Sequence, residues 1–163
     1  MKKIICLSAM LLILVGTTCA MAADAKVTKT VLTKENQAAL KGTWAGTMDF
    51  SRGEKCGIVM EVANDAAPFK GTLNLSNLPP SVAQFPGNFA NSTTYGGPFE
   101  NGIITNKGDF LVSGQAGNMG EFTLMGKEKL TGWFYLWGTR GTITLTKKAA
   151  PAAAPAAPAA TKK

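Results

Sequence analysis

Short stretches in which apolar and polar residues alternate, separated by turn-forming residues, run through most of residues 42–147. In the first stretch, Trp44 to Phe50, one set of alternate positions is mainly large and apolar and the other is small or polar. A period of two is that of a β-strand with one buried face. The pattern predicts strands at 44–50, 57–62, 69–76, 99–105, 109–115, 121–125, 129–137 and 142–146.

Most of the predicted strands are joined by segments of hairpin length that contain glycine. Loops this short make neighbouring strands antiparallel. About eight such strands close into a barrel that is filled with side chains or holds one small ligand. We therefore expect an all-β fold, a single antiparallel up-and-down barrel of about eight strands over residues 42–147.

One short helix is predicted before the barrel, at Thr33 to Lys41. Thr33 is a suitable N-cap, and Gly42 can end the helix in the left-handed conformation. Residues 23–32 are polar with few packing residues, so we interpret 23–41 as an N-terminal arm that carries this helix.

The regular pattern breaks between Asn77 and Pro98, which hold four prolines and three aromatic residues. A long irregular segment in a compact domain is commonly either functional or an element that was not recognised. It is interpreted here as a rim or lid loop carrying aromatic side chains, with an irregular edge strand inside it as the alternative.

The two ends of the chain have a different composition from the barrel segment. Residues 1–22 combine Lys2 and Lys3, an apolar run and a small-x-small site, which is typical of a signal peptide cleaved after Ala22. The bacterial periplasm or the medium is the expected location, without a transmembrane span after cleavage; a lipid anchor on Cys19 is the alternative. Residues 148–163, rich in Ala, Pro and Lys, are expected to form a disordered tail, either solubilising or tethering the protein to an anionic surface.

The positive charge gathers in these terminal segments. The chain has 17 Lys and Arg against 10 Asp and Glu, a net charge of +7. Six of the lysines are at positions 2, 3, 147, 148, 162 and 163, which leaves 11 basic and 10 acidic residues elsewhere. A nucleic-acid partner needs clustered basic residues on the fold, so none is expected.

The sequence contains no histidine, which excludes His-based metal sites and serine or cysteine nucleophiles paired with histidine. The ten acids are scattered, and Asp49, Glu54, Glu61 and Asp109 are expected to be solvated. We predict no catalytic residues, no metal and no cofactor. Cys56, the one cysteine after the leader, is interpreted first as a buried inert thiol, with a dimer bridge or a reactive thiol as alternatives.

Two sets of apolar residues are candidate sites. The predicted lining of a ligand pocket consists of inward-facing residues: Trp44, Met48, Phe50, Ile58, Met60 and Phe134. The strand 129–137 is apolar on both faces, and Trp133, Tyr135 and Trp137 fall on the face opposite Phe134. Such a patch is typical of an interaction surface for a protein or glycan, unless the N-terminal helix covers it through Ala38 to Leu40.

The Gly42-Thr43-Trp44 motif after a short helical turn resembles the Gly-x-Trp motif of calycins, the lipocalin and avidin-type barrels. The resemblance implies a basic side chain from near the last strand that packs across this Trp, with Arg140 as the candidate. Residues 42–56 also resemble the start of bacterial periplasmic inhibitors of secreted metalloproteases, which are eight-stranded barrels. Those inhibitors have a disulfide at the cysteine that enters the second strand, whereas no partner is available here for Cys56.

The expected function is that of an exported, non-enzymatic barrel that binds a small apolar or amphipathic ligand. The alternative is a protein- or glycan-interaction module, including a protease inhibitor, that acts through the aromatic strand.

Overall fold

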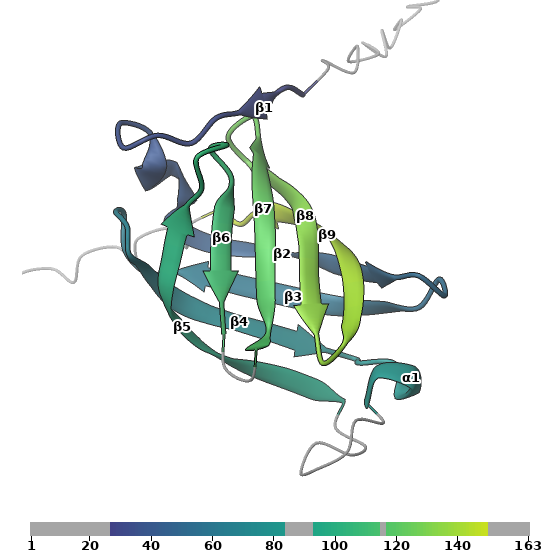
Figure 1. The fold of residues 1–163 in the computed structure, drawn as a ribbon. Helices are drawn as coiled ribbons and strands as arrows, with labels where there is room; N and C mark the ends of the chain where they lie inside the picture. The colour runs from purple at the N-terminus through teal and green to yellow at the C-terminus, as the bar shows by residue number, and fades with distance from the viewer. Residues whose placement is uncertain (1–26, 84–92, 115–116, 150–163) are drawn as a thin grey trace, which may run out of the picture.

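The computed structural model of the protein describes residues 27–83, 93–114 and 117–149. The predicted leader, most of the predicted tail and residues 84–92 of the predicted lid lie outside these ranges. The fold is a closed antiparallel barrel of eight strands, β2 to β9, in which each strand pairs with the next and β9 pairs back with β2 (Figure 1). The predicted all-β up-and-down barrel is therefore confirmed. The strands are β2 (Gly42–Phe50), β3 (Lys55–Val62), β4 (Phe69–Ser76), β5 (Thr94–Ile104), β6 (Phe110–Ser113), β7 (Met119–Met125), β8 (Lys129–Leu136) and β9 (Thr139–Lys147).

The core lies in the barrel interior, because alternate residues of each strand point inward. In β3, Cys56, Ile58, Met60 and Val62 are buried while Lys55, Val59 and Glu61 are exposed. The largest fully buried side chains are Trp44, Phe69, Phe110 and Phe122. Burial of each such side chain contributes about 1.5–3 kcal/mol to folding, so this interior is the main source of stability.

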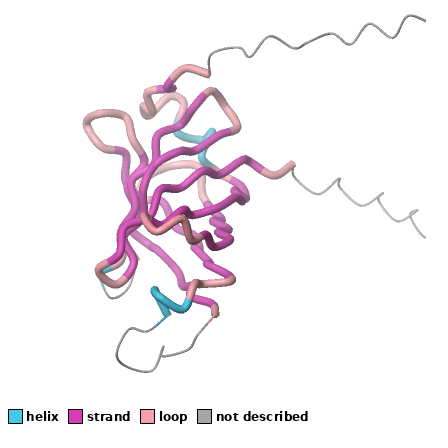
Figure 2. Tube along the Cα trace, turned by 90° about the vertical axis from the view of Figure 1, so that its right-hand side faces the viewer, coloured by secondary structure: helices cyan, strands magenta, loops and turns pink. Residues whose placement is uncertain are grey.

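The two short helices lie at opposite ends of the barrel (Figure 2). A 3-10 helix, Gln37–Leu40, packs at the end that we call the basal end, and α1 (Pro80–Ala83) lies at the end that we call the rim end. The N-terminal helix is shorter than predicted, and Thr33 is not its N-cap. The residue at that position is Asn36, whose side-chain oxygen accepts a hydrogen bond from the backbone N–H of Thr33.

A basic side chain covers Trp44 at the basal end, but it is Lys147 and not Arg140. The Nζ of Lys147 lies 5.1 Å from the centre of the Trp44 ring and donates a 2.6 Å hydrogen bond to the carbonyl of Ala39. The reason is register: Trp44 pairs with Lys147 at the end of β9, whereas Arg140 pairs with Tyr135 near its start.

A short extra strand, β1 (Lys29–Thr30), attaches the N-terminal arm to the end of β7. Lys29 also forms an ion pair of 2.8 Å with Asp109, whose carboxylate accepts a further hydrogen bond from Thr123. Asp109 is only 6% exposed, so the prediction of a solvated carboxylate was wrong at this position. The N-terminal arm covers this carboxylate through Lys29. Because the arm is distant in sequence, the residues around Asp109 could not predict that its carboxylate is buried.

The irregular segment is shorter than predicted, because β5 begins at Thr94 and not at Phe99. Thr94 to Pro98 pair along β4, and Pro98 is tolerated since no described strand pairs with this half of β5 on its other side. Among the described residues, β5 pairs with β6 only at Ile103 and Ile104. The first part of β5 therefore borders a stretch of wall that β6 does not reach.

Candidate functional site

A cavity of about 230 Å³ lies inside the rim end of the barrel, beside the first part of β5. Its walls include the inward-facing side chains of Leu73, Phe99, Val112 and Phe134, which are all buried. The short β6 explains its position, because no strand of the described residues pairs with this edge of β5. The cavity is thus a product of unequal strand lengths.

Gly97 widens the cavity from the β5 side. It pairs directly with Leu73 of β4, so the two residues face the same side of the sheet. A Cβ built on Gly97 meets nothing within 4 Å, and the backbone there is not left-handed. The space beside Gly97 is therefore open to a ligand.

Three residues from three different loops and strands border the cavity at the rim: Tyr95, Asn118 and Trp137. The Tyr95 and Trp137 rings meet edge to face, with centroids 4.8 Å apart. Asn118 is 1% exposed; its amide nitrogen donates to the Tyr95 hydroxyl, and its side-chain oxygen accepts a 3.2 Å hydrogen bond from the backbone N–H of Trp137. This polar cluster is the rim of an otherwise apolar cavity.

Trp137 adopts an unusual backbone conformation. It and Gly138 form the two-residue turn between β8 and β9, with φ values of 45° and 83°. Turns with two positive φ values favour Asn or Asp followed by Gly, and Trp in this conformation is strained. Strain of this kind is a marker of functional sites, and here it directs an aromatic ring to the cavity.

The six predicted pocket residues are all buried, but they occupy different parts of the molecule. Phe134 lines the cavity, and Phe50 borders a groove on the outside. Trp44, Met48, Ile58 and Met60 are packed in the core. Sequence reasoning missed Leu73, Phe99 and Val112 as lining; their alternation marks them as inward-facing, but the position of empty space depends on how far β6 extends.

The predicted aromatic interaction surface is divided in the structure. Trp133 and Tyr135 lie on the outer face of β8, and Tyr135 is 40% exposed. Trp137 is separated from them, because the positive φ at the turn breaks the alternation and its ring packs against Tyr95. The 3-10 helix lies at the basal end, beside Trp44, and not over the outer face of β8 (Figure 1).

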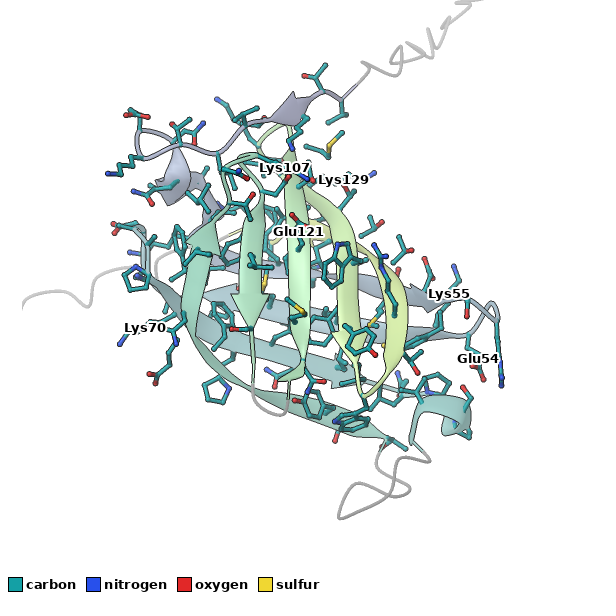
Figure 3. The ribbon with its side chains drawn as sticks, in the orientation of Figure 1. Glu54, Lys55, Lys70, Lys107, Glu121 and Lys129 are labelled. Atoms are coloured by element: carbon teal, nitrogen blue, oxygen red, sulfur yellow. The ribbon has the colours of Figure 1, made fainter. Side chains whose placement is uncertain are left out.

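Trp133 is held by its neighbours on that outer face. Its indole N–H donates a 3.3 Å hydrogen bond to Glu121, which Figure 3 shows on β7. The Arg140 guanidinium lies 4.8 Å from the centre of its ring. Trp133 and Arg140 border an outer groove of about 950 Å³ whose other wall includes Arg52 and Glu54.

Charged chemistry is sparse around the interior cavity. Within the described ranges, no three His, Cys, Asp or Glu residues are grouped so as to hold a metal ion. Cys56 is a free thiol and 3% exposed, as its first interpretation predicted. Burial, and then the nearby Asp49 charge, raise its pKa to about 11, so it is almost wholly protonated at neutral pH and a poor nucleophile.

Comparisons with protein-family models, curated proteins and solved structures each found no match for this chain. Among the residues that the structure describes, no helix has the length and apolar character needed to cross a membrane. The cavity and the outer surface are therefore the features of this chain that bear on its function.

Proposed function

We propose that the protein is an exported, non-enzymatic β-barrel that binds a small apolar or amphipathic ligand in the rim-end cavity. The observation that carries this proposal is an apolar cavity of about 230 Å³ inside a barrel whose basal half is packed. A dry cavity of about 150 Å³ is enough to bind benzene, whereas pockets for drug-sized ligands start at about 300 Å³. The volume supports a ligand with one or two rings, or a short chain.

The proposed export is supported by residues 1–22, which resemble a signal peptide. The absence of histidine from the sequence supports a binding role over a catalytic one. A calycin-like class is proposed as well. It is supported by the closed eight-stranded barrel and by the basic side chain above the Trp of the Gly-x-Trp motif.

The proposal is tested by native mass spectrometry of the protein purified from its own envelope fraction. We expect extra mass of up to a few hundred daltons on the folded protein that is lost on denaturation. The extracted compound, added back at increasing concentrations, should then raise the Tm of the protein in thermal unfolding, because a ligand that binds only the folded state stabilises that state. The proposal would be contradicted if the folded protein carries no extra mass and no small molecule extracted from the envelope fraction raises its Tm.

The second candidate function is a protein- or glycan-interaction module. It is favoured by Tyr135 and Trp133 on the outer face of β8, next to the outer groove that also contains Arg140. Partner capture should be lost in the Trp133→Ser, Tyr135→Ser double variant and retained in Trp137→Ser, whose ring belongs to the interior cavity. Equal capture of the partner by the parent, the double variant and Trp137→Ser would contradict this candidate function.

A further inference from the structure

The described residues that line the cavity at the rim end come from segments without charge. The stretches 71–99, 110–120 and 130–139 contain no Asp, Glu, Lys or Arg, although the chain has 27 charged residues in all. Every described residue that lines the cavity belongs to one of these three stretches. Figure 3 shows labelled charged residues elsewhere: Lys107 and Lys129 at the basal end, and Glu54 and Lys55 on the β2–β3 hairpin.

An ionised group that entered this cavity would lose its hydration without finding a counter-charge in the lining. Transfer of an unpaired charge into an apolar environment is strongly unfavourable. The polar side-chain groups of the described lining are the Tyr95 hydroxyl, the Asn118 amide and the Trp137 indole N–H, and all three are neutral hydrogen-bonding groups. The walls thus select against charge of either sign and tolerate a neutral polar group.

The lining also favours a ring. Phe99, Phe134, Tyr95 and Trp137 present aromatic side chains to the cavity, and aromatic pairs attract one another edge to face or offset. Gly97 leaves the open space beside them that a flat molecule needs. A side chain at position 97 would occupy the same space as the ligand.

We propose that this cavity is selective for an uncharged, ring-containing molecule of one or two rings with one neutral hydrogen-bonding group directed toward Tyr95 and Asn118, and that Gly97 sets its size limit. This inference rests on the proposed function, because it names the ligand class of the same cavity.

The test uses four probes of nearly the same shape: toluene, benzamide, benzoate and benzamidinium. Each is titrated at neutral pH into the isotopically labelled protein, and the amide resonances of Gly97, Asn118 and Trp137 are followed by NMR. We expect toluene and benzamide to shift these resonances with a dissociation constant at least tenfold lower than that of either charged probe. Benzamide should also shift the Asn118 side-chain amide more than toluene does.

The outcomes separate the two proposals. Binding of benzoate or benzamidinium at the same residues with the affinity of benzamide would overturn the selectivity for uncharged ligands and leave the ligand-binding barrel standing. If none of the four probes shifts these residues, both the selectivity and the proposed function of the cavity are contradicted.

The size limit is tested by Gly97→Val, with Thr47→Val on the exposed outer face of β2 as the matched control. Gly97→Val should weaken benzamide binding at least tenfold while Tm stays the same or rises, and Thr47→Val should bind benzamide as the parent does. Gly97→Ala provides a smaller filling if the valine variant does not fold. Unchanged benzamide binding in folded Gly97→Val would overturn the placement of the ligand beside Gly97.

Discussion

Two lysines that are adjacent in the sequence, Lys147 and Lys148, differ in what they contact. Lys147 lies over the Trp44 ring and donates to the Ala39 carbonyl, whereas Lys148 is exposed. Burial lowers the pKa of Lys147, and the charge of Glu128 opposes this shift. The adjacent pair provides a matched test of what the cation at the basal end contributes.

Lys147→Ala should destabilise the protein by about 2–4 kcal/mol, the sum of a cation–π contact and a hydrogen bond donated by a charged group. Lys148→Ala should change the free energy of unfolding by less than about 0.5 kcal/mol, as is usual for exposed positions. Urea unfolding of both variants measures the difference. Equal effects would show that the contact with Trp44 is not stabilising.

The environment of the Asp109 carboxylate leads us to expect that the folded protein loses stability in acid. Burial acts to raise its pKa, but hydrogen bonds from Lys29 and Thr123 and the charges of Lys29 and Lys107 lower it below its ordinary value. The folded protein therefore keeps the carboxylate ionised at pH values where the unfolded chain, with a pKa of about 3.9, becomes protonated. The stabilisation is complete above that value and is lost as pH falls toward the folded pKa.

Asp109→Asn should have a lower Tm than the parent at pH 6, and the difference should shrink between pH 4 and pH 2.5. Thermal unfolding monitored by circular dichroism across this range gives the comparison. Asp65→Asn, in the exposed loop before β4, is the control and should follow the parent at every pH. A constant gap between Asp109→Asn and the parent would contradict linkage to this carboxylate.

At the scale of the element, inward-facing glycines decide how closely neighbouring strands approach. A Cβ on Gly46 of β2 would lie 1.9 Å from the backbone oxygen of Thr144 in β9. A Cβ on Gly97 of β5 meets nothing within 4 Å. Both glycines lie within strands and neither has a positive φ, so the difference between them is one of tertiary packing.

Gly46→Ala should therefore lower Tm by more than 10 °C or prevent folding, because backbone atoms of β9 must shift at the β2–β9 pairing that closes the barrel. Gly97→Ala should leave Tm within a few degrees of the parent. Differential scanning calorimetry of the two variants makes the comparison. Similar Tm values for both would contradict the close β2–β9 contact.

At the scale of the whole molecule, the three tryptophans report on three separate regions. Trp44 lies at the basal end, Trp133 on the outer wall and Trp137 at the rim. A single core cluster contains buried residues from every barrel strand. Because small single domains with one core unfold cooperatively, tryptophan fluorescence and far-ultraviolet circular dichroism should give the same urea midpoint. A separate fluorescence transition would indicate that the rim unfolds independently of the barrel.

The sequence alone determined the number of barrel strands, their order and which residues point inward. These properties follow from local alternation and from short loops, because strands joined by such loops pair antiparallel. Ile58, Met60 and Phe134 could therefore be predicted as interior, and Cys56 as buried. Cavity position could not be predicted in the same way.

Only the tertiary structure decided which inward-facing residues meet empty space, which basic residue covers Trp44, and where the Trp137 ring points. Each depends on a register or strand length shared between segments distant in sequence: Lys147 with Trp44, the end of β6 beside β5, and the two-residue turn at Trp137. The burial of Asp109 likewise depends on an arm 80 residues earlier in the chain. Local alternation assigns a residue to a face, but the neighbours across that face come from the closed barrel.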